Sequence, residues 1–102
     1  MITRLWRGWT AREHADAYEL FLLTELFPQM RGIAGFRGAE VLRRDEDAEV
    51  AFVTLTRFDT LDAVRAFAGE DFETPVLEPT ARALLSRYDA QALHFETSSF
   101  EL

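Results

Sequence analysis

The stretch AEVAFVTLTRFDTLDAVRAFAG, residues 48–69, decides the fold of this chain. Its first half, residues 48–58, alternates in the way a β-strand does. Its second half, residues 59–69, repeats apolar side chains at helical spacing, and Asp59 or Thr60 is predicted to cap that helix. Gly69 is predicted to end it. The buried face of the helix is expected to consist of Leu61, Val64, Phe67 and Ala68.

Both faces of the strand are largely apolar. One face carries Val50, Phe52, Thr54, Thr56 and Phe58, and the other carries Ala51, Val53, Leu55 and Arg57. An antiparallel sheet in a small monomer usually leaves one face to water. We therefore expect the helices of the chain to cover one face and a second copy of the chain to cover the other, which makes the predicted assembly a homodimer.

The segment before this stretch predicts a strand and a long helix. Residues 2–9 favour a strand, and Thr10 with Glu13 fits a capping box at the start of a helix over residues 11–29. The apolar stripe of that helix consists of Ala15, Tyr18, Leu22 and Leu26, widened by Phe21 and Phe27. Residues 20–27, LFLLTELF, are apolar almost all round, which predicts burial on more than one side. Pro28 is expected to kink or end the helix.

The remaining segments complete the predicted topology. A strand is expected at residues 36–44, an acidic hairpin loop at 45–47, a loop at 70–79, a helical piece at 81–88 and a last strand at 90–101. The order strand–helix–strand–strand–helix–strand is that of the ferredoxin-like split βαβ fold. The predicted fold is therefore α+β, one domain over residues 1–102, with helices on one face of a four-stranded antiparallel sheet.

Composition excludes several classes of function. The net charge of −7 argues against nucleic-acid and anionic-membrane partners. The absence of cysteine removes thiol nucleophiles, disulfides and the usual structural zinc sites. Neither a secretion signal nor an apolar run of about 20 residues is present, so a cytoplasmic protein is expected.

Three segments resemble the antibiotic biosynthesis monooxygenase family. They are GFRGAEVLR at 35–43, FVTL at 52–55 and FDTLDAVRAFA at 58–68, and the similarity in element order extends over nearly the whole chain. The resemblance implies a dimeric α+β barrel. It also implies, as in some members, cofactor-free oxygenation of a phenolic or quinol substrate held between helices and sheet. Relatives with the same fold bind and degrade haem.

The chain also departs from that family. It contains no asparagine, which the best-known members use, and Trp6 and Trp9 lie on the first predicted strand. No catalytic residue of the family therefore transfers to a position in this chain.

Two residues are candidates for proton transfer. A neutral His94 imidazole could take a proton from a phenol near pH 7, although a hydrogen-bonded strand histidine without a catalytic duty fits the sequence too. Tyr18, on the first helix, is the second candidate.

Other residues are candidates for a substrate pocket. His14, Tyr18, Phe21 and Glu25 lie at spacings of four, three and four, which predicts either a pocket wall or a helix flank at the subunit boundary. Glu25 is the carboxylate expected to be partly buried. Trp6, with Trp9 and Phe36, could stack on a flat ligand, or these rings could fill the core or the dimer contact.

The arginines leave two alternatives open. Arg4, Arg7, Arg37 and Arg57 could bind an acidic substrate, or they could pair across strands with Glu40 and Glu96.

These observations lead to two main functional hypotheses. The first is a cofactor-independent monooxygenase that oxidises a small aromatic, quinol-like molecule with O2, and it needs neither a cofactor nor a metal. The second is a non-catalytic dimeric ligand-binding or accessory protein on the same fold. Haem binding is a third alternative.

Overall fold

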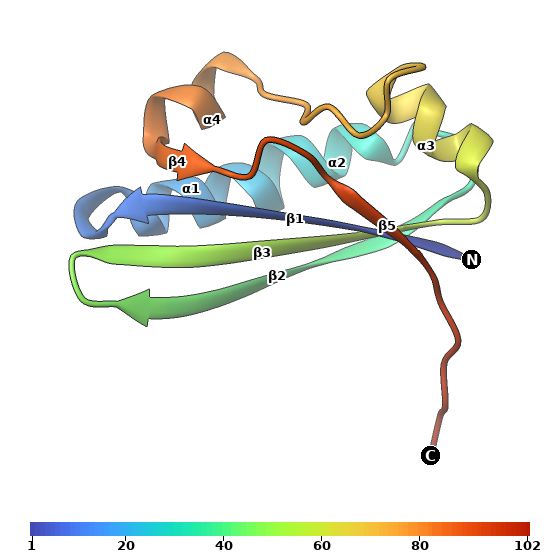
Figure 1. The fold of residues 1–102 in the computed structure, drawn as a ribbon, viewed down its shortest axis with the longest axis horizontal. Helices are drawn as coiled ribbons and strands as arrows, with labels where there is room; N and C mark the ends of the chain where they lie inside the picture. The colour runs from blue at the N-terminus through green and yellow to red at the C-terminus, as the bar shows by residue number, and fades with distance from the viewer.

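A computed structural model describes residues 1–102, and it is built around a five-stranded antiparallel sheet in the order β2-β3-β1-β4, with β5 also paired to β1 (Figure 1). The strands are β1 (Ile2–Ala11), β2 (Phe36–Glu46), β3 (Glu49–Phe58), β4 (Leu85–Tyr88) and β5 (Leu93–Glu96). Strands β4 and β5 pair with opposite ends of β1 and together fill the position of the predicted fourth strand. The ferredoxin-like α+β prediction is confirmed.

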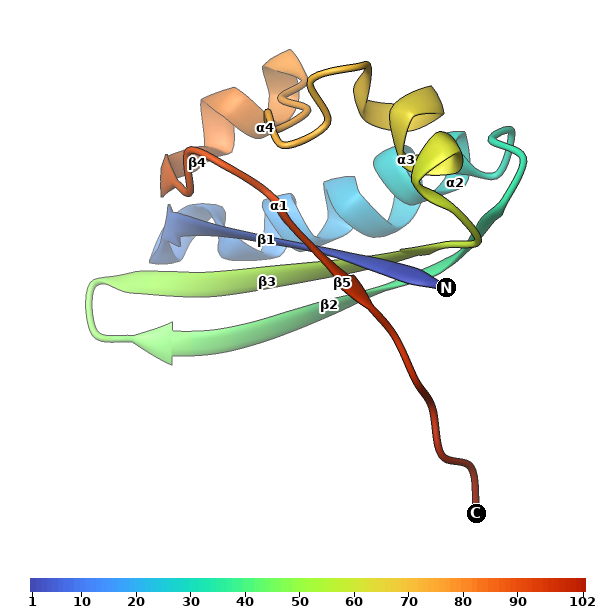
Figure 2. The same ribbon diagram turned by 45° about the vertical axis from the view of Figure 1, so that its right-hand side comes forward.

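All helices lie on one face of this sheet, and the C-terminal tail extends past the opposite face (Figures 1 and 2). The helical segments are a 3-10 turn η1 (Arg12–His14), α1 (Ala15–Phe21), a π-helical turn η2 (Leu22–Leu26), α2 (Phe27–Met30), α3 (Leu61–Ala68) and α4 (Pro79–Leu84). None of them has both the length and the hydrophobicity that a membrane-spanning helix needs.

The predicted capping box at Thr10 is wrong. Strand β1 continues to Ala11 because Thr10 pairs with Val50 and Ala11 pairs with Glu49 of β3. Thr10 is fully buried and its hydroxyl has no hydrogen-bond partner, and the first helical turn follows Ala11 without a side-chain cap. Pairing with the neighbouring strand prevails here over the local capping signal, and a β-branched residue fits the strand well.

The long helix is confirmed, but it is not uniform. Segments η1, α1, η2 and α2 follow one another from Arg12 to Met30, so the helix continues through Pro28. The amide of Phe27 donates to the carbonyl of Leu22, five residues earlier, directly before Pro28. A π-turn at this point is consistent with the missing amide hydrogen of proline, because the regular ladder is already interrupted there.

The hairpin and the short helix follow the prediction closely. Strand β2 extends to Glu46, so the turn is only Asp47 and Ala48, and Asp47 has a positive φ of 48°. The predicted three-residue acidic loop is therefore too long, because Asp45 and Glu46 pair with β3. Thr60 caps α3 by accepting from the amide of Ala63 at 3.2 Å, and Gly69, with φ 88°, ends the helix.

The C-terminal part differs most from the prediction. Helix α4 ends at Leu84, and the next four residues form β4 instead of continuing the helix to Tyr88. Strand β4 pairs with β1 where Gly8 makes room, since a Cβ atom there would lie 2.8 Å from Leu85 Cδ2. The last strand is confined to Leu93–Glu96, and residues 97–102 form no regular structure.

The core fills the layer between the helices and the sheet. Tyr18 meets Phe52 edge to face at 5.0 Å between ring centroids, and Phe58 lies 5.6 Å from Phe36 and 6.1 Å from Phe67. The predicted stripe of the first helix is buried, apart from Leu26, which is half-buried. The prediction that residues 20–27 are buried on more than one side is wrong within one subunit, because Leu20 and Leu23 are more than half exposed. Leu61, which was predicted to lie on the buried face of α3, is exposed as well.

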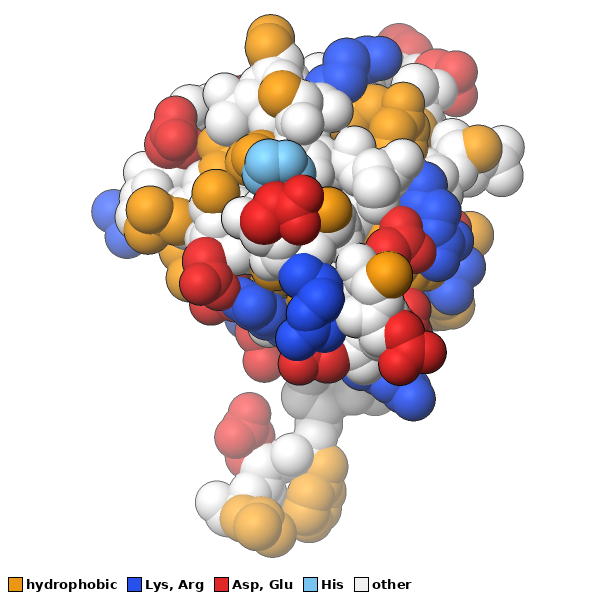
Figure 3. All heavy atoms as spheres, turned by 90° about the vertical axis from the view of Figure 1, so that its left-hand side faces the viewer, with side chains coloured by type: hydrophobic (Ala, Val, Ile, Leu, Met, Phe, Trp, Pro, Cys, Tyr) orange, Lys and Arg blue, Asp and Glu red, His pale blue; other side chains and the backbone are white.

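The opposite face of the sheet is covered only in part. At one end Trp9 is buried, because the guanidinium groups of Arg87 and Arg7 lie 3.9 and 5.3 Å from its ring. Elsewhere on this face Leu42, Leu93 and Phe95 are about half exposed. At the end of the molecule shown in Figure 3, acidic and basic side chains alternate and no region of a single charge forms.

Candidate functional site

A small cavity of about 40 Å³ lies between the helices and the helix-facing side of the sheet. Ten of its fourteen lining residues are hydrophobic, and the lining consists of Arg4, Trp6, Tyr18, Phe21, Leu22, Leu26, Phe27, Met30, Thr54, Thr56, Phe67, Val76, Glu78 and Ala81. Its volume has room for about three waters, whereas a cavity that holds benzene measures about 150 Å³.

The irregular part of the long helix forms one wall of this cavity. Leu22 and Leu26, the first and last residues of the π-turn η2, both line it, with Tyr18 and Phe21 before them. π-Turns inside helices occur frequently at functional sites. This wall therefore combines apolar lining with a local departure from regular helix.

Tyr18 places a phenol in the wall. The residue is 1% exposed, and its hydroxyl makes no hydrogen bond within the chain. Burial raises the pKa of Tyr18, so the phenol stays protonated at neutral pH. Tyr18 is therefore suited to donate a hydrogen bond to a ligand in the cavity and is a poor general base in its resting state.

Arg4 places a positive charge at the same cavity. It is 5% exposed, and its Nη1 group donates to the carbonyl of Phe72 and to Nε2 of His94, the latter at 3.0 Å. Its Nη2 group donates to the carbonyl of Thr74 at 3.2 Å. Burial lowers the pKa of Arg4 to about 10, which still leaves the group charged at neutral pH.

His94 does not line this cavity. It lies behind Arg4, beside an open groove of about 500 Å³ whose walls also include Phe72, Ala92 and Leu93. Because a guanidinium can only donate, Nε2 of His94 must accept from Arg4, which leaves the ring proton on Nδ1. Burial, and then the charge of Arg4, lower the pKa of His94. His94 is therefore neutral and helps to hold the Arg4 guanidinium in place by accepting its hydrogen bond.

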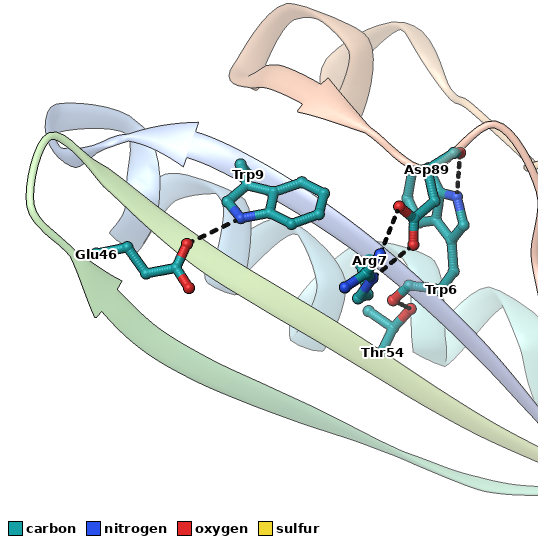
Figure 4. Close-up of polar contacts among 6 residues, drawn as sticks. All are labelled: Trp6, Arg7, Trp9, Glu46, Thr54 and Asp89. Atoms are coloured by element: carbon teal, nitrogen blue, oxygen red, sulfur yellow. Dashed lines mark hydrogen bonds and ion pairs between the residues drawn. The ribbon is translucent and has the colours of Figure 1, made fainter.

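The two tryptophans have different surroundings. Trp6 lines the cavity, and its indole N–H donates to the backbone carbonyl of Asp89 at 2.8 Å (Figure 4). Trp9 lies on the opposite face of the sheet, where its N–H donates to Glu46 at 3.1 Å. Phe36 is not among the lining residues and packs against Phe58 instead.

The structure separates the four predicted pocket residues of the first helix. Tyr18 and Phe21 line the cavity, whereas His14 and Glu25 are exposed and do not. The expectation that Glu25 is partly buried is wrong, because the helix turns that side chain outward, away from the buried stripe. Spacings of three and four thus identified neighbouring positions, but only the inner pair faces the sheet.

Three of the four arginines form ion pairs, but only Arg57 pairs with a predicted partner. Arg57 pairs with Glu40 at 2.8 Å, as predicted, whereas Arg37 pairs with Asp59 and Arg7 with Asp89. Arg4 is the exception, since it takes part in no ion pair with a carboxylate.

Sequence reasoning missed part of the lining. Thr54 and Thr56 were placed on the correct strand face without a role, and Phe67 was assigned to the core. Val76 and Glu78 come from the connection before α4, whose path no local pattern specifies. One signal could have identified the two threonines. They are polar residues on a strand face that is otherwise apolar, and such residues place hydroxyl groups inside the helix–sheet layer.

Metal-binding side chains do not cluster. No group of three or more His, Cys, Asp or Glu side chains comes together that could hold a metal ion.

Replacement of His94 by glutamine will weaken the acid sensitivity of the fold. The pKa of His94 is lowered in the folded chain from its usual 6.5, so protonation favours the unfolded chain. The free energy of unfolding therefore falls as the pH drops through 6.5 and below. Above that pH His94 is neutral in both the folded and the unfolded chain, and this destabilisation is absent. Glutamine keeps an acceptor for Arg4 without a titrating group. Urea unfolding between about pH 7.5 and about pH 5 should show a smaller loss for His94→Gln than for the unmodified chain.

The matched control for this measurement is His14→Gln. His14 is exposed and makes no hydrogen bond with Arg4. Its replacement should therefore leave the difference in unfolding free energy between the two pH values unchanged. Equal pH dependence for His94→Gln and the unmodified chain would contradict the assignment of His94 as a partner of Arg4.

Comparison with solved structures identifies the same architecture elsewhere. A crystal structure of an antibiotic biosynthesis monooxygenase matches with a TM-score of 0.65 and 16% sequence identity, covering 97% of this chain and 100% of that one. The structure of Rv0793 from Mycobacterium tuberculosis matches with a TM-score of 0.58 and 17% identity, covering 98% of each chain. No protein-family model and no curated protein matches the sequence. The chain therefore has the fold of these two proteins from one end to the other, as the family resemblance implied.

Proposed function

We propose that this protein is a cofactor-independent monooxygenase that oxidises a small aromatic, quinol-like molecule with O2. The observation that carries the proposal is the aromatic-lined cavity that combines a free, protonated phenol at Tyr18 with a buried positive charge at Arg4. The fold shared with a protein described as an antibiotic biosynthesis monooxygenase supports it by analogy.

The proposed reaction balances without an external reductant. A ring CH2 group, as in an anthrone, first loses a proton to give a resonance-stabilised anion. That carbon then transfers electrons to O2 and forms a C–O bond. It ends as a carbonyl carbon, having lost both hydrogens and gained one oxygen atom, and the second oxygen atom leaves as water. All four electrons that O2 accepts come from the substrate.

Two lining residues are suited to the proton movements. Tyr18 is the hydrogen-bond donor that would stabilise negative charge on the substrate oxygen. Glu78 is the only carboxylate residue on the cavity wall and is the proposed acceptor of the substrate proton. Trp6 and Phe21 would hold the ring between them.

Substrate entry requires the cavity to enlarge. Val76 and Glu78 belong to the connection between α3 and α4, and the amides of Val76 and Leu77 donate no backbone hydrogen bond. We propose that this connection moves outward to admit the ring, because it is the part of the wall with the fewest backbone hydrogen bonds.

Oxygen consumption tests the proposal, and Tyr18→Phe is the informative variant. A panel of anthrones and quinols, supplied without any cofactor, should support oxygen uptake by the unmodified chain. Loss of the phenolic donor should lower kcat by about 100-fold, as the loss of one oxyanion donor does elsewhere.

Tyr88→Phe is the matched control, because that tyrosine lies on β4 outside the cavity lining and should keep full activity. Failure of every substrate to support oxygen uptake would refute the enzymatic proposal.

The small size of the cavity favours a second candidate function. A volume of about 40 Å³ holds no aromatic ring as it stands. A non-catalytic dimeric protein on this fold, either an accessory protein or one that binds its ligand outside the cavity, needs no such opening, and it would show self-association without oxygen uptake.

We further propose that the chain forms a homodimer through the open face of the sheet. Leu42, Leu93 and Phe95 are about half exposed there, and Val53 and Leu55 of β3 lie between the strands that carry them. A stable interface buries about 800 Å² of each partner, a modest share of the 6377 Å² surface of this chain. Light scattering should give twice the 11.7 kDa mass of one chain.

A further inference from the structure

Arg4 occupies a position that is unusual for a charged residue. It lies in the middle of the sheet, paired with Thr56 of β3 on one side and His94 of β5 on the other. Its side chain is on the helix-facing side, where it is 5% exposed and lines the cavity. A charged side chain is almost never fully buried unless it is paired.

Its protein partners do not neutralise its charge. Two backbone carbonyls and the neutral ring of His94 accept its hydrogen bonds, and the ring of Phe67 lies 5.6 Å from its Cζ atom. Seven other arginines each have a carboxylate within ion-pair distance, namely Arg7, Arg12, Arg37, Arg43, Arg57, Arg65 and Arg87. Arg4, the only buried arginine, has no carboxylate within that distance.

An unneutralised buried charge is costly to maintain. Removing a guanidinium from water without a counter-ion destabilises a fold, and truncation or a neutral core residue would avoid that cost. The fold instead holds the group in place with carbonyls from residues 72 and 74 and with His94. A guanidinium has five N–H donors, and the three contacts to the chain do not use all of them.

We infer that Arg4 is the recognition group for an ionised oxygen, a phenolate or a carboxylate, on the aromatic ligand of this cavity. The inference rests on the proposed function in taking the ligand to be aromatic. The inference adds that the ligand is negatively charged, because the ligand would provide the negative charge that the chain does not place beside Arg4. In the proposed oxidation, Arg4 would favour the ionised form of the substrate, which is the form that transfers electrons to O2.

The net charge of the chain makes the inference testable. At −7 the protein as a whole repels anions, so preference for an anion over its neutral analogue requires a local cation. Benzoate and benzamide are nearly the same size and differ in charge. Calorimetry, or the fluorescence of the cavity residue Trp6, should show that benzoate binds at least 10-fold more tightly than benzamide.

A phenol provides the second arm of the test. The absorbance of 4-nitrophenol reports its ionisation, and binding beside Arg4 should lower its apparent pKa by about one unit, a 10-fold change in the ionisation equilibrium. A preference for benzoate without this shift would assign the site to carboxylates, whereas the shift alone would assign it to phenolates.

Arg4→Gln should abolish both effects, and Arg4→Lys should keep part of them because the charge remains. The matched control is Arg57→Gln, which removes an arginine from the opposite face of the sheet and should change neither. The charge preference of the unmodified chain is itself decisive if Arg4→Gln does not fold.

Equal binding of benzoate and benzamide, together with no shift of 4-nitrophenol, would overturn the inference, as would failure of all three to bind. A preference that persists in folded Arg4→Gln would overturn it too. These outcomes are independent of turnover. A chain that prefers benzoate but consumes no oxygen would refute the proposed oxidation and leave the anion site intact.

Discussion

Replacement of Phe58 by alanine will lower the free energy of unfolding by about 3–5 kcal/mol. Phe58 is completely buried at the end of β3, with Phe36 at 5.6 Å and Phe67 at 6.1 Å between ring centroids. Removing the ring takes away its burial and leaves a cavity that rigid neighbours fill only in part. Because total stability of a domain is typically about 5–15 kcal/mol, the variant should be close to its unfolding threshold.

Thermal and urea unfolding measure this effect. Each kcal/mol lowers Tm by about 4–8 °C in a domain of about this size, so the loss should exceed about 12 °C. Phe100→Ala is the matched control, because Phe100 is 89% exposed in the C-terminal tail and its replacement should change stability by no more than about 0.5 kcal/mol. Similar losses of unfolding free energy for the two variants would show that the cluster of Phe36, Phe58 and Phe67 makes no special contribution to the stability of the core.

The same substitution links the core to the cavity. Phe67 packs against Phe58 and also lines the cavity beside Arg4, 5.6 Å from the guanidinium carbon. A Phe58→Ala chain that still folds should therefore bind ligands more weakly, because Phe67 loses the ring that fixes its position. Stability and site geometry share one aromatic cluster.

The elements that the sequence predicted well are those specified by local periodicity. Strand β3 and helix α3 lie within one residue of their predicted bounds, because alternation, the Thr60 cap and Gly69 act over a few neighbouring residues. The long helix follows for the same reason, since its apolar stripe repeats over several turns.

The misplaced elements are those that depend on partners distant in the sequence. Residues 85–88 have a helical pattern, yet they pair with β1 at Gly8, about eighty residues earlier. Thr10 resembles a helix cap, yet its backbone pairs with Val50. Tertiary pairing overrides propensity in both cases, and no local window contains the partner.

The candidate site was predictable only from the side of the helix. Tyr18 and Phe21 could be placed at the helix–sheet layer, because they occupy inward positions of a regular helix, whereas the sequence left open which side of the sheet Trp6 would face. Arg4 occupies an inward position too, but the alternation pattern alone does not show whether a carboxylate will face it. Its partners come from the irregular connection at residues 72–74, and the path of that connection is decided by packing.

Placing an arginine at Leu55 will dissociate the proposed homodimer. Leu55 is at the centre of the open sheet face, between Leu5 of β1 and Glu40 of β2. Within one subunit the new guanidinium can reach water and the carboxylate of Glu40, so the fold should tolerate it. In a two-fold dimer each arginine would be buried against the partner's sheet near its own symmetry copy, and the dissociation constant should rise at least about 100-fold, or about 2.8 kcal/mol.

Light scattering and sedimentation over a dilution series measure that constant. The matched control is Leu20→Arg, which places the same side chain at a leucine 61% exposed on α1, on the helix side of the molecule. The control should remain as dimeric as the unmodified chain, because only the position of the charge relative to the sheet face differs. Dimers that survive Leu55→Arg but not Leu20→Arg would move the interface to the helices, where Leu20 and Leu23 are the exposed apolar residues. The apolar second face of β3 would then be left without a partner, and the reason for expecting a barrel of two sheets would fail with it.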